Sequence, residues 1–211
     1  ITQIPYTFAL GITRSLSSDL NADAIPDGDA SGVPTIQTRT ALQFSKFAIG
    51  ASAHYGLLNA PGTAQEEYAT WSINIDGKFD LSSQITLLGE AYTGVNTAAY
   101  YGAISHHDCV NELKSRGGWI NLTYDPNGPL AFSLGGGLDD LCDEEKNYLA
   151  NLPDIRSQNA FEFGLVTYAL SSNTQFGFEI SHWQTKYRNP SPNNARIAND
   201  LRLQWSVQSA F

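Results

Sequence analysis

The end of the chain, residues 201–211, reads LRLQWSVQSAF and sets the pattern from which the rest can be interpreted. Apolar side chains occupy every second position up to a break at Ser209, namely Leu201, Leu203, Trp205 and Val207, and the chain closes on Phe211. Successive side chains of a β-strand point to opposite faces. This alternation therefore predicts a strand with one apolar and one polar face.

The same alternation runs back through the chain. Ile4 to Ile12 and Trp71 to Phe79 show it most clearly, and no segment fits helical spacing. We expect about ten strands of the length that a tilted membrane strand requires, at 4–13, 36–44, 47–56, 70–79, 84–92, 119–124, 131–138, 161–168, 176–181 and 200–211. In the eighth of these, Phe161, Phe163 and Leu165 are assigned to the apolar face and Glu162 to the polar face.

Composition narrows the class of protein. The chain has 211 residues, a net charge of −9 and no Met. A single domain spanning residues 1–211 fits this length, and the acidic balance argues against nucleic-acid binding. No run approaches the roughly 18 apolar residues of a membrane helix, and no signal peptide is recognisable.

Short and long connections between the expected strands alternate along the chain. The short ones are 45–46, 80–83, 125–128 and 171–173, and the long polar ones are 14–33, 57–67, 95–116, 139–158 and 188–194. Asp125-Pro126-Asn127-Gly128 has tight-turn chemistry, in which Pro presets φ and Gly tolerates positive φ. Tight turns on one side and long loops on the other are typical of an outer-membrane barrel. We predict an all-β, antiparallel, up-and-down transmembrane β-barrel.

The last strand resembles the C-terminal signature of Gram-negative outer-membrane β-barrel proteins. Leu203, Trp205 and Val207 match its alternating outward positions, Phe211 matches the terminal aromatic residue, and Ser209 departs from the usual apolar choice. The resemblance implies an integral outer-membrane location, recognition by the barrel-assembly machinery, and contact with membrane lipid and lipopolysaccharide.

Later segments resemble the C-terminal part of large bacterial porins. They are Gly89 to Gly94, Gly117 to Trp119 and Gly177 to Trp183. Such porins have about sixteen strands, so the resemblance suggests that an N-terminal part is missing here. It implies a homotrimer and passive diffusion of small hydrophilic solutes or ions. The alternative is a narrow closed barrel that acts as an adhesin or structural surface protein through its acidic loops.

The polar face supplies the candidate functional residues. They are Arg39, His54, Asp76, Lys78, Glu90, Tyr92, Glu162, Glu179, Asp200 and Arg202. In an open barrel these side chains would line the pore and set its ion preference. In a narrow barrel they would fill the interior with salt bridges. The surplus of Asp and Glu in the long loops predicts a preference for cations at the mouth.

The first long loop carries oxygen ligands at alternate positions. Asp19, Asn21, Asp23 and Asp27 resemble the start of a calcium loop. The pattern then fails, because Ala24 and Ala30 stand where an EF-hand places Gly and a bidentate Glu. We therefore favour a solvated acidic loop, with a structural calcium site as the alternative, and no other cofactor is expected.

Cys109 and Cys142 lie on two long loops that flank one hairpin, so they emerge on the same side of the membrane. In an oxidising compartment we expect them to pair. A disulfide closing about 33 residues stabilises by roughly 3–4 kcal/mol in the loop-entropy model. His106, His107 and Asp108 are residue types that can act in catalysis or metal binding, but adjacent side chains on an extended chain point in opposite directions and rarely share one site. No enzyme activity is expected.

Overall fold

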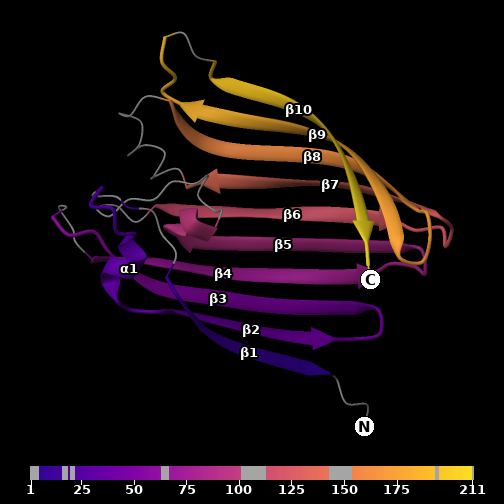
Figure 1. Ribbon diagram of the computed structural model, residues 1–211, viewed down its shortest axis with the longest axis horizontal. Coiled ribbons are helices and arrows are strands. Elements are labelled where there is room, and N and C mark those ends of the chain that lie inside the picture. The colour runs from indigo at the N-terminus through magenta and orange to yellow at the C-terminus, as the bar shows by residue number, and fades with distance from the viewer. Residues whose placement is uncertain are drawn as a thin grey trace.

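The structure is a computed structural model that describes residues 5–15, 19, 22–62, 67–100, 113–142, 154–192 and 195–210 (Figure 1). The strands are β1 (Tyr6–Thr13), β2 (Thr35–Gln43), β3 (Phe47–Asn59), β4 (Glu67–Asp80), β5 (Ile85–Val95), β6 (Lys114–Tyr124), β7 (Leu130–Leu141), β8 (Ile155–Ala169), β9 (Thr174–Arg188) and β10 (Ile197–Ser209). Two short helices, α1 (Asp27–Ser31) and η1 (Thr97–Tyr100), follow β1 and β5. Within the described residues no helix is long and apolar enough to cross a bilayer.

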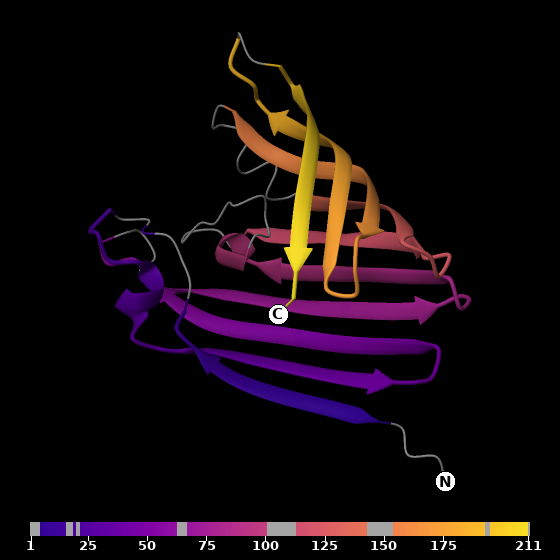
Figure 2. The same ribbon diagram turned by 45° about the vertical axis from the view of Figure 1, so that its right-hand side comes forward.

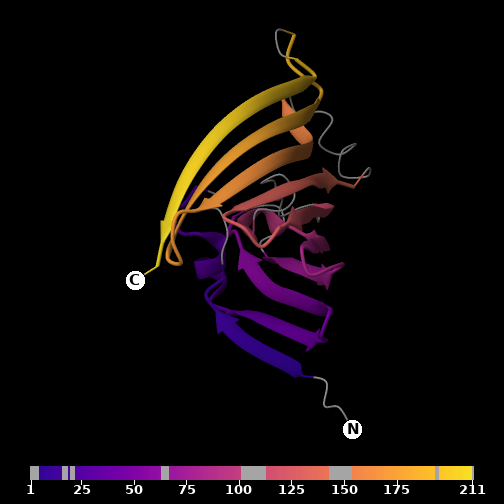
Figure 3. The same ribbon diagram turned by 90° about the vertical axis from the view of Figure 1, so that its right-hand side faces the viewer.

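The strands form one ten-stranded sheet in sequence order, β1 to β10, and each strand pairs antiparallel with its neighbour in the chain. The sheet is strongly curved, like part of a barrel wall (Figures 2 and 3). In the described part, β1 and β10 are its two edges. The predicted up-and-down arrangement of ten antiparallel strands is confirmed.

Short turns and long connections lie at opposite ends of the sheet (Figure 1). Several strands reach further toward the long-loop end than the sequence predicts; β7, for example, continues to Leu141 and β8 begins at Ile155. In the turn after β6, the positive φ falls on Asn127, at 60°, and not on Gly128. The Asn127 N–H donates to Asp125 Oδ1 at 2.9 Å, which closes the turn.

The strand register divides the side chains into two faces. Cross-strand partners share a face, so a row can be followed from Asp76 to Glu90, Trp119, Gly137, Phe161, Trp183 and Asp200. We call this the inward face, because it is mostly polar and carries η1, whose Tyr100 stacks on His54. The opposite, outward face carries Ile73, Ile75, Leu203 and Trp205.

The outward face is apolar and exposed. Trp205 is 77% exposed, Ile12 is 70% exposed and Leu134 is 67% exposed. The buried apolar clusters are small and lie near the long-loop end, around Leu113 and Leu141 and around Leu58 and Tyr68. A soluble sheet would cover such a face, whereas a membrane barrel presents it to lipid.

The faces of β8 were assigned the wrong way round from the sequence. Phe161 pairs with Gly137 and Phe163 pairs with Gly135, and both glycines share the inward row with Trp119 and Asn121. Phe161, Phe163 and Leu165 therefore face inward, and Glu162 faces outward. The glycines of β7 leave the space that these rings occupy, so apolar side chains fit on the inward side of this strand.

Candidate functional site on the inward face of the sheet

The nine remaining residues expected to line a pore all lie on the inward face. The register places Arg39, His54, Asp76, Lys78, Glu90, Tyr92, Glu179, Asp200 and Arg202 on the same side as one another. The alternation of side chains along regular antiparallel strands is sufficient to place them on one face, because paired residues on neighbouring strands point to the same side. The site is therefore a surface to which six strands, β2 to β5, β9 and β10, contribute these residues, and not a compact pocket.

Arg39 and Asp76 form the strongest polar contact of this face. Two guanidinium nitrogens donate to the two carboxylate oxygens, Nη1 to Oδ2 at 2.6 Å and Nη2 to Oδ1 at 2.8 Å. Beside them, the Asn74 amide donates to Ser52 Oγ at 3.1 Å. Gly50 lies beneath the ion pair, and a Cβ there would come within 2.6 Å of both Arg39 Nη2 and Asp76 Oδ2. The fork geometry needs that glycine.

His54 lies closer to the long-loop end of the same face. Its Nδ1 is 2.8 Å from Ser72 Oγ, its Nε2 is 3.3 Å from Thr70 Oγ1, and its ring stacks on Tyr100 with centroids 4.1 Å apart. The ring stack attaches η1 to the inward wall, and the hydrogen bonds join His54 to β4. A cavity of 530 Å³ opens beside them, lined by polar groups that include Arg39, Asn74 and Glu90.

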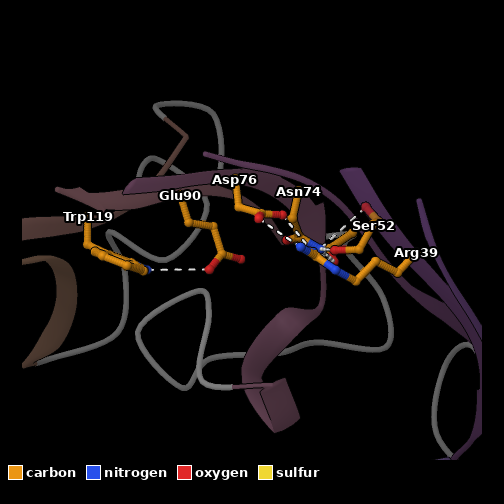
Figure 4. A network of polar contacts seen from close by, with 7 residues as sticks. Arg39, Ser52, Asn74, Asp76, Glu90 and Trp119 are labelled. Carbon is orange, nitrogen blue, oxygen red and sulfur yellow. Dashed lines mark hydrogen bonds and ion pairs between the residues drawn. The ribbon is translucent and has the colours of Figure 1, made fainter. Parts of the chain in front are cut away.

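The polar network continues toward β6. Trp119 Nε1 donates to Glu90 Oε2 at 3.4 Å, and Figure 4 shows Trp119, Glu90, Asp76, Asn74, Ser52 and Arg39 along one face of the sheet. One row higher, the Tyr92 hydroxyl donates to Asp139 Oδ1 at 2.5 Å. Hydrogen-bond donors thus meet the carboxylates of both Glu90 and Asp139.

Two further ion pairs lie near the ends of this face. Lys78 Nζ is 3.3 Å from Asp80 Oδ1 beside the short turn that follows β4. At the other side of the sheet, Arg202 Nε donates to Asp200 Oδ2 at 2.6 Å. Along the described strands, the inward acidic residues Asp76, Asp80, Glu90, Asp139, Glu179 and Asp200 outnumber the basic residues Arg39, Lys78, Arg156 and Arg202.

Sequence reasoning missed the aromatic part of the face. Phe161 and Trp183 stack with centroids 4.6 Å apart, and Phe163 lies next to Phe161 at 6.3 Å. The available signal was at the other end of the β8–β9 hairpin. Tyr168 pairs with Phe176, whose outward phase is clear, and counting back from that pair gives the correct faces.

The first long loop is described only in part. Asp19 accepts hydrogen bonds from the backbone of Asp23 and Ala24, at 3.2 and 2.8 Å, and Asp27 accepts one from Tyr68. Asn21 lies outside the described residues. Within the described part, no group of three or more His, Cys, Asp or Glu side chains could hold a metal ion. Calcium binding stays a prediction.

The remaining sequence candidates are placed in part. Leu203, Trp205 and Val207 lie on the outward face, as a terminal barrel strand requires, while Phe211 lies outside the described residues. Cys109 and the segment His106 to Asp108 also lie outside them, so the pairing of Cys109 with Cys142 is untested. Recognition by the assembly machinery stays a prediction.

Comparison by sequence finds no matching family model and no matching curated protein. Comparison by structure does find matches. The outer-membrane channel DcaP of Acinetobacter baumannii superposes with a TM-score of 0.76 at 12% identity, covering 97% of this chain and 59% of that one. A porin refined at 1.8 Å gives a TM-score of 0.57 at 9% identity, covering 96% and 57%.

The chain thus spans 59% and 57% of the lengths of these two channels. Its ten strands correspond to part of a larger barrel, and its apolar outward face faces lipid in such a barrel. An integral outer-membrane location follows from the fold and from that face together. The chain has the fold of the outer-membrane porin channels.

Proposed function

We propose that the chain forms part of the wall of a porin that lets small hydrophilic solutes and ions diffuse passively across the outer membrane. The observation that carries this proposal is the continuous polar inward face on a sheet whose outward face is apolar. A wall of this kind separates water from lipid. It needs no energy source and no enzymatic step.

The width of the barrel supports an open lumen. A barrel of about eight to ten strands is nearly filled by its own side chains, whereas porins of sixteen to eighteen strands leave an aqueous channel. The ten strands here match a little under three fifths of each channel that they resemble. We therefore favour the channel over a narrow closed barrel that acts as an adhesin or structural surface protein.

The charge on the inward face supports a preference for cations. Acidic residues outnumber basic ones on the inward face of the described strands, and three of its four basic side chains, Arg39, Lys78 and Arg202, lie against a carboxylate. The field inside a low-dielectric wall concentrates ions of opposite sign. The homotrimer, lipopolysaccharide contacts and handling by the assembly machinery belong to the same proposal.

Conductance in a planar bilayer tests the function directly. The full-length protein should give steady ohmic currents in KCl and a reversal potential that favours K⁺ over Cl⁻. Asn74→Trp should lower the single-channel conductance, because Asn74 lies on the inward face, which would line the proposed lumen. Ile75→Trp, with the same change on the adjacent outward residue, should leave it unchanged. Silent insertion of correctly folded protein would overturn the proposal.

A further inference from the structure

A group of aromatic side chains occupies the inward face where a simple diffusion pore needs only polar groups. Phe161 and Trp183 stack at 4.6 Å with planes 21° apart, and Phe163 continues the group at 6.3 Å from Phe161. Trp119 lies in the same cross-strand row, separated from Phe161 by Gly137. Water-facing aromatic surface is costly unless something covers it.

Glycines make room for these rings. A Cβ at Gly137 would lie 2.5 Å from Phe161 Cε1, and a Cβ at Gly135 would lie 2.5 Å from Phe163 Cε1. On β6, a Cβ at Gly117 would lie 2.5 Å from Tyr92 Cε1. Each ring extends over the backbone of a neighbouring strand. The aromatic surface therefore consists of rings that each pack over a glycine on a neighbouring strand, and not of isolated apolar residues.

Carboxylates lie beside the rings. A cavity of 280 Å³ between β5 and β9 is lined by Glu90, Asp139, Tyr92, Trp119, Phe161 and Trp183, which we call the aromatic cleft. Trp119 donates weakly to Glu90 at 3.4 Å and Tyr92 donates to Asp139 at 2.5 Å, so both acids lie at its edge. Aromatic faces and carboxylates both attract cations.

The chain itself shows this chemistry at the margin of the cleft. The Arg202 guanidinium carbon lies 4.9 Å from the centroid of a Trp183 ring. The same side chain donates from Nε to Asp200 Oδ2 at 2.6 Å. A flat organic cation on β10, two strands away from Phe161 on β8, is thus already held between a ring and a carboxylate.

We propose that the aromatic cleft binds organic cations that carry an aromatic or flat apolar part as they pass through the lumen. This inference rests on the proposed channel function and names the class of solute that the channel slows and selects. The ammonium group would lie near Glu90 and Asp139. The apolar part would pack on Phe161 and Trp183.

Benzyltrimethylammonium is the probe. Added to the full-length protein in a planar bilayer, it should reduce the K⁺ current in a saturable, concentration-dependent way. Tetramethylammonium lacks the ring and benzenesulfonate carries the opposite charge, so both should block at least about five-fold more weakly. Stronger block by a neutral oligosaccharide than by benzyltrimethylammonium would overturn the proposal in favour of a sugar site.

Variants locate the site. Phe161→Leu keeps apolar volume but removes the ring and should weaken the block about five-fold. Phe178→Leu makes the same change on the outward face and should leave the block unchanged. If Phe161→Leu does not fold, Glu90→Gln provides the second test and should weaken it by a similar factor.

The outcomes separate the two proposals. Equal block in wild type, Phe161→Leu and Glu90→Gln, with normal K⁺ current, overturns the cleft and leaves the channel intact. Absence of K⁺ current in correctly inserted wild-type protein overturns the channel function itself.

Discussion

The inward face is made in two different ways on its two halves. On β2 to β4, Arg39, Ser52, Asn74 and Asp76 form a network of one ion pair and amide hydrogen bonds. On β7 to β9, inward rings of β8 lie opposite glycines of β7, as Phe161 lies opposite Gly137. The first half neutralises its own charge, and the second offers apolar surface beside carboxylates. Under the proposed function, one wall would combine a hydrated surface with a surface that holds a solute.

The largest difference in stability between the halves should appear when a larger residue replaces an inward glycine. At Gly137, a Cβ would lie 2.5 Å from Phe161 Cε1 and 2.9 Å from the Gly118 carbonyl oxygen. Gly137→Val should therefore lower the free energy of unfolding by about 1–3 kcal/mol through overpacking. The measurement is urea unfolding in detergent, followed by tryptophan fluorescence.

Gly11→Val is the matched control, because Gly11 is also inward and the nearest atom to its added Cβ, Gln37 Cβ, is 4.0 Å away. It should change stability by no more than about 0.5 kcal/mol. Equal losses in the two variants would show that the rings do not depend on the glycines beneath them.

The next largest effect should come from breaking the ion pair of the first half. Asp76→Asn leaves the Arg39 charge without its carboxylate, so the ratio of K⁺ to Cl⁻ permeability should fall by up to about five-fold. The double variant Arg39→Gln with Asp76→Asn removes both charges and should return most of the original ratio. Reversal potentials in a salt gradient measure all three proteins, and an unchanged ratio in the single variant would place the pair away from the ion path.

A smaller effect is expected where the two halves meet. The Trp119 Nε1 to Glu90 distance of 3.4 Å marks a weak hydrogen bond. Trp119→Phe removes the donor and should change stability by about 0.5 kcal/mol or less. Its selectivity for K⁺ should stay the same, because the Glu90 charge remains. A large shift of the reversal potential would show that Trp119 controls the position of that carboxylate.

The smallest effect concerns a pair outside the membrane-spanning strands. Hydrogen bonds from Arg14, one of them from Nε to Oδ1 at 2.6 Å, lower the pKa of the exposed Asp29 carboxyl group. This contribution to stability is present above the unfolded pKa and is lost as the pH falls through the lower folded pKa. In Arg14→Gln, NMR titration should show the pKa of Asp29 rising toward its ordinary value, and an unchanged pKa would exclude Arg14 as the cause.

The sequence predicts most of the fold because the decisive signal is local. On β3 and β4, Ile49, Ile73 and Ile75 alternate with Gly50, Asn74 and Asp76, and polarity alone assigns the correct faces. On β8 polarity alone does not assign the correct faces. Alternation separates the side chains into two sets but does not show which set faces inward. The sequence pattern predicts an outward Phe161, because apolar side chains of a membrane strand usually face lipid. The space that Gly137 leaves for its ring is on another strand, so the sequence of β8 does not reveal it.

The candidate site could be predicted as a face but not as a set of contacts. Arg39 and Asp76 lie 37 positions apart, and only the register brings them together. The stacking of Phe161 on Trp183 depends likewise on the pairing of β8 with β9. Such contacts follow from strand order and register, which the pattern of one strand does not contain.

The most direct test of the central claim compares two neighbouring residues of β3. Ser52 is inward and Ala53 is outward, and cysteine is close in size to both. In full-length protein with Cys109 and Cys142 replaced by Ser, a charged, membrane-impermeant thiol reagent should reduce the bilayer current of Ser52→Cys and leave that of Ala53→Cys unchanged. A reduced current in Ala53→Cys alone, or in neither variant, would contradict the assignment of this face to a water-filled lumen.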